Sequence, residues 1–362
     1  MNRCSLLSRR LAVGAAAVAA LVAGQATARM QTPAAGPDPR GITAVDGLKV
    51  GSITLTERPT GCTVIVVDGA GAVGGVSQRG GAPGTRETDL LDPANMVDKV
   101  NAIVLSGGSA FGLEAATGAV RWLEEHDMGW DVRIAKVPIV PSAILFDLPV
   151  GGNPKVRPTA DCGYKAAAAA TNGKVQEGSV GAGAGATVGK SGGGNRAMKA
   201  GLGSYAIRMP NGLVVGAIVA VNAVGDIIDP DTGKIVAGVR NPDDTFADAR
   251  QILRRGGPSQ TPRPGQNTTI GLVATNAKLS KSDAHRMAMM ADDGFARAIF
   301  PSHTMGDGDT VFSLATGTWS GEPNLTQIGA LAADVMAKAI VRAATEATGL
   351  PNLPAARDLA KR

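Results

Sequence analysis

Apolar and polar positions along the chain predict a succession of short strands and helices. Apolar runs bounded by turn residues predict strands at 48–55, 62–67, 102–105, 213–221, 270–274 and 311–315. Apolar residues at helical spacing predict helices at 113–125, 164–170, 245–254, 280–299 and 324–348. The segment from Ser280 to Asp283 resembles a capping box at the start of the fourth helix. The run at 213–221 lacks alternation, so we expect this strand to be buried on both faces and to end at Asn222.

The segment 265–275 joins a loop to one of these strands. A polar run rich in proline and glycine, 255–265, cannot hold regular structure and predicts an exposed loop. Thr268 and Thr269 follow it and precede the buried strand at 270–274. A self-cleaving hydrolase would place its nucleophile at such a junction, although a plain loop entering a strand is the simpler explanation of this stretch alone.

The beginning of the chain has the composition of an export signal. Arginines precede a run of small apolar residues at 11–23, and an A-x-A sequence ends at Ala28. We therefore predict a signal peptide at 1–28 and an exported, periplasmic protein. The pair Arg9-Arg10 leaves the twin-arginine route open. No other stretch is apolar enough to span a bilayer, so we expect no membrane partner.

Charge and composition argue against a nucleic-acid partner. The formal net charge of +5 falls to about +2 once the three arginines of the signal are removed. Aromatic residues make up 3% of the chain, and the remaining basic residues are scattered. Neither a phosphate-tracking stripe nor a base-stacking platform is therefore predicted. Glycine, with 49 residues, has about twice its usual share, which predicts many tight turns in a globular chain.

Cysteine and histidine are too few and too widely spaced to predict a metal site. The chain has Cys4, Cys62 and Cys162, three histidines and no paired-cysteine spacing. We expect neither a metal nor a cofactor. Cys62 and Cys162 could pair in an oxidising compartment, but two separate buried hydrophobes is the favoured interpretation.

Two glycine-rich segments each resemble a known catalytic or binding motif but lack one of its required glycines. The G-x-S-x-G pattern around Ser109 fails because Phe111 replaces the second glycine, so we expect a tight turn with Ser109 as a helix cap. The phosphate-loop pattern that ends at Lys190 and Ser191 lacks its first glycine, at Ala184. Lys190 nevertheless lies on a glycine-lined backbone, where its ammonium can approach another group closely.

Polar side chains stand at the ends of two predicted strands. Asp307 and Asp309 precede the strand at 311–315, and Val311 at the next alternate position ends any EF-hand pattern. Asn222, at the mouth of a buried strand, is a ready hydrogen-bond donor, although a turn cap is the commoner role of such a residue.

Six motifs occur together and in order, and their combination is more specific than any one of them. They are the segments 80–89, 106–113, 181–190, 221–223, 267–269 and 307–310. Together they resemble the DmpA-type family, which comprises L-aminopeptidase/D-esterases, beta-peptidyl aminopeptidases and nylon-oligomer hydrolases. The similarity extends over essentially the whole exported chain. The pair Asn267-Thr268 is closer to the nylon-oligomer branch than to the members that use serine.

The resemblance implies an N-terminal-nucleophile hydrolase of the α/β (α+β) class, folded as a four-layer αββα sandwich of the DmpA and ornithine acetyltransferase type. It implies a precursor that cuts itself between Asn267 and Thr268. A large chain, 29–267, and a small chain, 268–362, would stay associated in one domain, commonly within a homotetramer. A threonine hydroxyl needs a base, which the freed α-amine of Thr268, with a pKa of about 8, could supply.

The same resemblance gives each of four further side chains a role. Asp307 and Asp309 would orient the hydroxyl and amine of Thr268. Asn222 would donate a hydrogen bond to the oxyanion of the tetrahedral intermediate. Lys190 would support Asn222 or the nucleophile electrostatically. Each of these residues alone has an ordinary structural explanation, which is hard to sustain for all of them in the family's order.

One residue departs from the family pattern. Some relatives place a tyrosine near the oxyanion where this chain has Phe146, so that donor is missing unless Tyr164 reaches the site. The leading hypothesis is an exported amidase or aminopeptidase that acts through Thr268 on short peptides or unusual amides. The alternatives are an endo-hydrolase of 6-aminohexanoate (nylon) oligomers, an acyltransferase of the ornithine acetyltransferase kind, and a non-catalytic binding protein.

Overall fold

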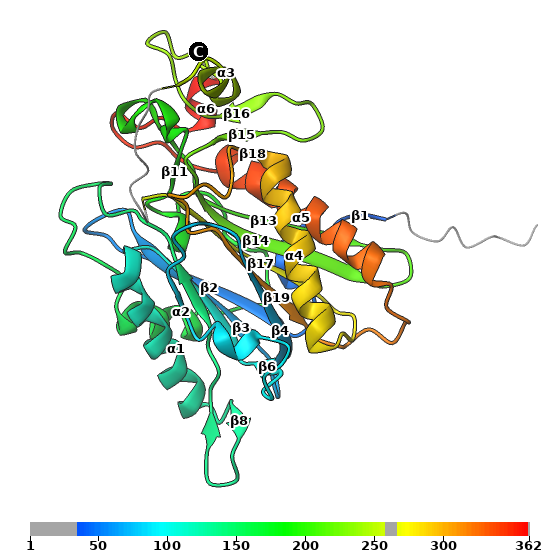
Figure 1. The fold of residues 1–362 in the computed structure, drawn as a ribbon. Helices are drawn as coiled ribbons and strands as arrows, with labels where there is room; N and C mark the ends of the chain where they lie inside the picture. The colour runs from blue at the N-terminus through cyan, green and yellow to red at the C-terminus, as the bar shows by residue number, and fades with distance from the viewer. Residues whose placement is uncertain (1–34, 258–265, 361–362) are drawn as a thin grey trace, which may run out of the picture. The chain divides into compact units, whose positions relative to one another are not determined.

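Two β-sheets face each other, and helices cover the outer face of each sheet (Figure 1). The computed structural model describes residues 35–257 and 266–360. The predicted signal peptide and most of the predicted loop at 255–265 lie outside the described residues. The order of helices, sheet, sheet and helices is the predicted four-layer αββα sandwich.

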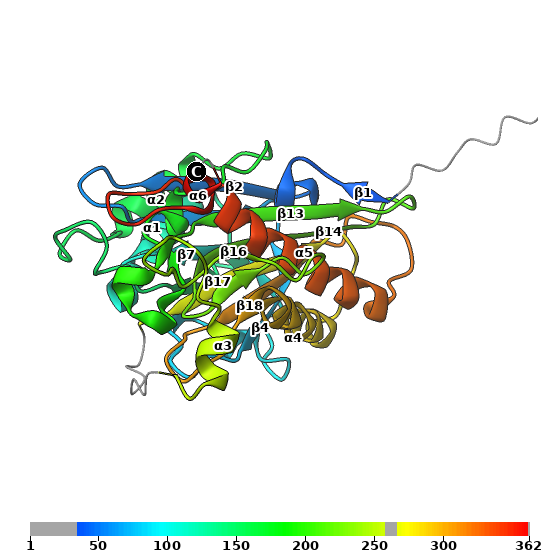
Figure 2. The ribbon, with the colours of Figure 1, turned by 90° about the horizontal axis from the view of Figure 1, so that it is seen from above.

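The larger sheet contains the strand that begins at Thr268. Within the described residues its strands lie in the order β1-β13-β14-β17-β19-β4-β6. Strands β14 and β17 are antiparallel, whereas β17 and β19 are parallel; Figure 2 shows β13, β14 and β17 side by side. The bounds are β1 Gly36–Pro37, β4 Ala72–Gln78, β6 Lys99–Val100, β13 Leu202–Arg208, β14 Val214–Asn222, β17 Thr268–Thr275 and β19 Thr310–Ala315.

The smaller sheet has the order β2-β3-β7-β10-β5 and packs against α1 and α2, while α4 and α5 pack against the larger sheet. The strands are β2 Leu48–Thr54, β3 Gly61–Val67, β5 Thr85–Arg86, β7 Ala102–Ser106 and β10 Ser142–Ile144. The helices are α1 Glu114–Glu125, α2 Ala160–Ala168, α4 Lys281–Ala298 and α5 Leu325–Thr345.

The remaining strands and helices are short and lie outside the two main sheets. They are β8 Trp130–Asp131, β9 Lys136–Val137, β11 Thr187–Val188, β12 Met198–Lys199, β15 Asp226–Ile228, β16 Ile235–Ala237, β18 Ile299–Phe300, α3 Ala249–Arg254 and α6 Ala356–Leu359. Strands β11 and β12 pair with each other, and β15 pairs with both β16 and β18.

The cores explain why the central strands are apolar throughout. In β14, Ile218 lies in the core between the two sheets, and its neighbour Val219 lies in the core under α4 and α5. Val64 and Ile65 of β3 divide in the same way between the helix-covered core and the central core. A strand buried on both faces has no solvent side for polar residues, as the sequence of 213–221 predicted.

The predicted helices are present, with shifted ends. The capping box is confirmed, because the Ser280 hydroxyl accepts from the main chain of Asp283 and the Asp283 carboxylate accepts from that of Ser280. The prediction for Ser109 is wrong. Ser109 has φ 57° and opens a 3₁₀ turn without a side-chain cap, and α1 begins only at Glu114.

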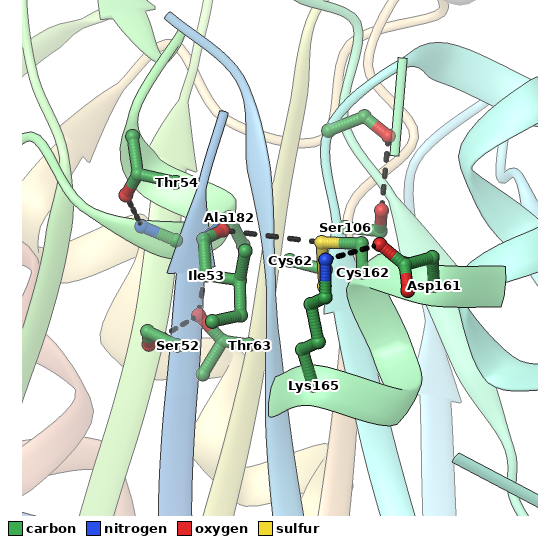
Figure 3. The surroundings of a disulfide bond; sticks show 12 residues. Ser52, Ile53, Thr54, Cys62, Thr63, Ser106, Asp161, Cys162, Lys165 and Ala182 are labelled. Carbon is green, nitrogen blue, oxygen red and sulfur yellow. Dashed lines mark hydrogen bonds and ion pairs between the residues drawn. A yellow bond between two sulfur atoms is a disulfide. The ribbon is translucent and has the colours of Figure 1, made fainter. Parts of the chain in front are cut away.

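Cys62 and Cys162 form a disulfide, so the favoured interpretation as two separate buried hydrophobes is wrong (Figure 3). The bond links β3 to α2, and the two Cα atoms are 6.2 Å apart. The residues are 100 positions apart in sequence, and only the packing of α2 on the smaller sheet brings them together. Within the described residues, no helix has both the length and the apolar character needed to cross a bilayer.

Candidate active site

The strand order brings the predicted site residues to one end of the larger sheet. Thr268 is the first residue of β17 and pairs with Asn222, the last residue of β14. On the other side of β17, Ile270 pairs with Thr310, so the segment before β19 reaches the start of β17. A parallel bridge joins Asn267 to Asp307. Residues far apart in sequence therefore meet around the Asn267-Thr268 peptide bond.

The carbonyl group of Asn267 is held by main-chain hydrogen bonds. Its oxygen accepts from the N–H of Gly308 at 2.9 Å, and the N–H of Asn267 donates to the carbonyl of Gly306 at 3.3 Å. The Thr268 hydroxyl lies against the same Asn267 oxygen, and Thr268 is almost completely buried. A hydroxyl, the adjacent carbonyl group and a donor to the carbonyl oxygen are thus assembled in the intact chain, as attack on that carbonyl would require.

Asn222 is fixed on both ends of its side-chain amide. Its Oδ1 accepts from the Lys190 ammonium at 3.0 Å and from the Thr187 N–H at 3.0 Å. Its Nδ2 donates to the carbonyl of Phe146 at 3.0 Å. Because Lys190 and Thr187 can only donate at these positions, Oδ1 and Nδ2 cannot exchange places, and the amide has one defined orientation.

Lys190 approaches Asn222 closely, as expected from its glycine-lined surroundings. The ammonium also donates to the Asn222 carbonyl at 2.9 Å. Burial lowers the pKa of Lys190 to about 7, while the negative charges of Asp307 and Asp309 act in the opposite direction. Thr187 is a contact that sequence reasoning missed, since nothing in its glycine-rich segment marks it.

Asp307 and Asp309 have different surroundings. Oδ2 of Asp307 accepts from the N–H and the hydroxyl of Thr304, whereas its buried Oδ1 has no hydrogen-bond partner among the described residues. Burial, followed by the charge of Asp309, raises the pKa of Asp307 to about 6. Asp309 accepts from the N–H of Thr269 at 2.8 Å and from His303.

The main chain around Phe146 is anchored by a buried ion pair that sequence reasoning did not identify. Arg58 Nη2 and Asp147 Oδ1 are 2.9 Å apart, and both side chains are fully buried. Asp147 also accepts from the Thr60 hydroxyl at 2.6 Å and the Gly108 N–H at 2.9 Å. These bonds fix the chain next to the Phe146 carbonyl that holds Asn222. An aspartate in the apolar run 138–147 was the available signal, because a buried charge needs a partner.

A cavity of about 1280 Å³ opens beside this cluster. Lys190, Thr187 and Asn267 contribute to its wall, and much of the rest is apolar, including Phe146, Val150, Ile252, Leu253, Leu350 and Leu353. Among the described residues that line it, Lys190 is the one charged side chain. The volume is ample for a small amide or peptide.

Tyr164 does not replace the missing tyrosine. It lies on α2, where its hydroxyl donates to Glu125 at 2.7 Å and its ring lies under Arg121. Phe146 therefore contributes its main-chain carbonyl and an apolar ring to the site. Among residues 35–257 and 266–360, no group of three ligating side chains is arranged to hold a metal ion.

Several known proteins are similar to this chain. The sequence profile of Peptidase family S58 matches residues 40–354. An uncharacterised aminopeptidase of Mycobacterium tuberculosis is 43% identical over 346 residues, which cover 88% of this chain and 97% of that protein. A 6-aminohexanoate-oligomer endohydrolase of Kocuria sp. is 32% identical over 321 residues, covering 82% and 84%.

The fold also matches a solved structure. The L-aminopeptidase D-Ala-esterase/amidase of Ochrobactrum anthropi, described as a variant of the Ntn hydrolase fold, superposes with a TM-score of 0.64. The match covers 88% of this chain and 90% of that one at 20% sequence identity. The four-layer architecture is therefore of the N-terminal-nucleophile type predicted from the six motifs.

Proposed function

This chain belongs to peptidase family S58, the DmpA-type family of peptide-bond hydrolases, and we propose that it is an amidase or aminopeptidase with Thr268 as its N-terminal nucleophile. One observation carries the proposal. The Thr268 hydroxyl lies against the carbonyl of Asn267, and that carbonyl oxygen is held by the Gly308 N–H at 2.9 Å.

The first reaction is cleavage of the chain by itself. The Thr268 oxygen attacks the Asn267 carbonyl carbon, the C–N bond breaks, and the Thr268 nitrogen takes the proton that the hydroxyl loses. The product is an ester between Asn267 and Thr268. Water then hydrolyses this ester, releasing the Asn267 carboxylate and a Thr268 residue with both a free hydroxyl and a free α-amine. The Gly308 N–H stabilises the negative charge on the Asn267 oxygen during the attack.

The processed enzyme uses the new α-amine as the base for its own hydroxyl. The hydroxyl attacks the carbonyl of an amide substrate, the amine leaves after protonation, and water hydrolyses the acyl-enzyme. Asn222 has a second Nδ2 hydrogen beyond the one bound by Phe146, and this hydrogen serves the oxyanion. Lys190 holds Asn222 in place. Asp307 and Asp309 provide negative charge that favours the ammonium form of the Thr268 amine.

The cavity favours substrates with an uncharged acyl segment. An aminopeptidase that requires a free substrate ammonium needs an acceptor or a carboxylate to bind it, and the described lining offers Lys190 as its charged group. An ammonium deep in this cavity would find neutral acceptors such as Ser191 and Thr304 but, among the described lining residues, no carboxylate. The second candidate function is therefore an endo-acting amidase, as is the 6-aminohexanoate-oligomer endohydrolase to which the chain is similar.

The nucleophile is tested by mass spectrometry of the purified protein. We expect wild type to yield two fragments that divide between Asn267 and Thr268. Thr268→Ser keeps a hydroxyl and is expected to cut, whereas Thr268→Ala is expected to stay whole. A wild-type chain that stays intact after prolonged incubation, or a Thr268→Ala chain that is cut at this bond, would contradict the proposal.

The exo and endo functions are separated by paired substrates. A short β-amino or ω-amino acyl anilide is supplied with its amine free and with the same amine acetylated. Preference for the acetylated member indicates endo action, and strict dependence on the free amine indicates an aminopeptidase. Release of free acid in plain buffer, without an added acceptor amine, distinguishes hydrolysis from acyl transfer.

Export and assembly complete the proposal. The disulfide between Cys62 and Cys162 supports an oxidising compartment, which agrees with the signal peptide proposed at 1–28. The two pieces made by self-cleavage would stay associated, because β17 and β14 share a sheet across the cut. Cell fractionation tests the location, and light scattering of the processed protein tests the proposed homo-oligomer.

A further inference from the structure

His303 is a partly buried group that the proposed reaction does not use. It precedes β19 and has φ 55°, a left-handed backbone conformation that is unfavourable for a residue other than glycine. In this conformation its main-chain N–H and its Nδ1 both meet Oδ2 of Asp309, each at 3.0 Å. Two donors from one residue therefore converge on a single carboxylate oxygen.

The other oxygen of Asp309 binds the start of β17, the strand that begins with Thr268. Its Oδ1 accepts from the N–H of Thr269 at 2.8 Å, one residue after Thr268. The Asp309 carboxylate thus bridges His303 and the start of β17. An ionised carboxylate can only accept, so Nδ1 of His303 carries a hydrogen in this arrangement.

Helix α4 contributes two side chains to the surroundings of His303. Phe295 stacks on the imidazole, with ring centroids 5.8 Å apart and planes inclined by 18°. Asp292 lies three residues earlier, on the same face of the helix, and is fully buried. Burial raises the pKa of Asp292 to about 6, and Arg79 lies 3.5 Å from its Oδ2. Ser77 is also beside the carboxyl, though neither Asp292 oxygen has regular hydrogen-bond geometry with a described residue.

Three charged groups act on the imidazole: Asp309 before β19, Asp292 on α4, and Arg79 after β4. Burial alone would lower the pKa of His303. The hydrogen bond to Asp309 and the negative charges of Asp309 and Asp292 outweigh burial and the opposing Arg79, so the pKa is raised above its ordinary value of 6.5.

We propose that His303 is a positioning residue for Thr268: it clamps Oδ2 of Asp309 so that Oδ1 holds the Thr269 N–H. The clamp fixes the direction in which β17 leaves Thr268, and hence the position of the hydroxyl relative to the Asn267 carbonyl. This inference rests on the proposed function, because it concerns the geometry of the proposed nucleophile.

The clamp is tested with three substitutions of His303. The side-chain amide nitrogen of His303→Asn can reach the place of Nδ1, whereas that of His303→Gln lies one methylene further out, near the place of Nε2. We expect His303→Ala to slow self-cleavage by about 100-fold, the effect of a misplacement of about 1 Å at a reacting centre. His303→Asn should recover a large part of the rate, and His303→Gln little of it.

The charge on the ring is tested separately in the uncut Thr268→Ala precursor. The chain has three histidines, so labelled imidazole signals can be followed individually by NMR during a pH titration. We expect the His303 midpoint to lie above 6.5 and to fall when Asp292→Asn is added. A midpoint that does not change with Asp292→Asn contradicts the role given to Asp292.

The outcomes separate this inference from the proposed nucleophile. Cleavage of Thr268→Ala at the same bond would refute the assignment of Thr268 as the nucleophile. If Thr268→Ala stays uncut but His303→Ala cuts at the wild-type rate, only the positioning role of His303 is refuted. Equal slowing by the Ala, Asn and Gln variants would also overturn the clamp, since packing would then explain the effect. If His303→Ala does not fold, the comparison of Asn with Gln at matched melting temperature decides the question.

Discussion

The N–H of Gly308 donates to the carbonyl oxygen of Asn267 at 2.9 Å, across the bridge between the segments that lead into β19 and β17. The oxygen that accepts this bond belongs to the peptide group next to the Thr268 hydroxyl. The parallel pairing of β17 and β19 thus supplies a donor where negative charge would develop during self-cleavage.

Moving this donor should slow self-cleavage. In Gly308→Ala, the new methyl group would lie 2.6 Å from the Ala82 carbonyl oxygen and 3.1 Å from the Thr268 hydroxyl, so the segment must shift. We expect a loss of about 10²- to 10³-fold in the cleavage rate, as for removal of an oxyanion donor. The rate is measured by following the two fragments over time.

Gly173→Ala is the matched control, because a Cβ at that position meets only the Thr171 hydroxyl, at 3.5 Å. It should cut at the wild-type rate. Cleavage at the wild-type rate by a folded Gly308→Ala chain would contradict the role of the Gly308 N–H in self-cleavage.

Asn222 should be needed for hydrolysis by the processed enzyme. Asn222→Asp keeps the shape but replaces the Nδ2 donor by an acceptor, and we expect kcat to fall by about 10²- to 10³-fold. Thr187→Val removes one hydroxyl contact to Oδ1, at 3.2 Å, while leaving the main-chain bond in place. It should cost far less, and similar losses in both variants would argue against a direct oxyanion role for Asn222.

Self-cleavage should slow in acid, because the ionised Asp307 carboxylate is proposed to orient the Thr268 hydroxyl. Its pKa, raised to about 6 by burial and by the charge of Asp309, means that the carboxylate gains a proton as the pH falls through about 6. We expect the cleavage rate to decline roughly tenfold per pH unit below that point. Asp307→Asn should cleave itself slowly at every pH, and its rate should not show this acid limb, the decline below about pH 6.

Processing should move the decline in acid to higher pH. The base in the processed enzyme is the Thr268 α-amine, whose ordinary pKa is about 8 and whose ammonium form the neighbouring carboxylates favour, so hydrolysis should fall off at a pH where the precursor still cuts. Identical acid limbs for the two reactions, or an unchanged limb in Asp307→Asn, would assign the titration to another group.

The disulfide should stabilise the fold without serving the chemistry. Its two cysteines are 100 residues apart, so loop entropy predicts a loss of about 4 to 5 kcal/mol in the free energy of unfolding when both become alanine. The measurement is urea unfolding of the uncut Thr268→Ala chain with and without the two cysteines. Reductant should lower the stability of the parent and leave the double variant unchanged. The double variant with Thr268 restored should still cut itself at low temperature.

The sequence was informative where a residue's role depends on its immediate neighbours. The uninterrupted apolar run at 213–221 predicted a doubly buried strand ending at Asn222, and the capping box at Ser280 predicted the start of α4. The loop-to-strand junction singled out Thr268, although the strand begins at Thr268 itself, two residues before its apolar run. The six ordered motifs gathered Lys190, Asn222 and the two aspartates before any geometry was known.

Only the tertiary structure could decide which of these groups touch. The order β14-β17-β19 sets Asn222 and Gly308 on opposite sides of the Asn267-Thr268 bond, and no local pattern encodes that order. For the same reason, no local pattern predicted the disulfide, the Arg58–Asp147 pair or the His303–Asp309 contact. Periodicity and capping arise from interactions a few residues apart, so the chain displays them directly. Hydrogen bonds between distant segments depend on how whole layers pack. The sequence therefore contains both partners of such a bond but does not show that they are in contact.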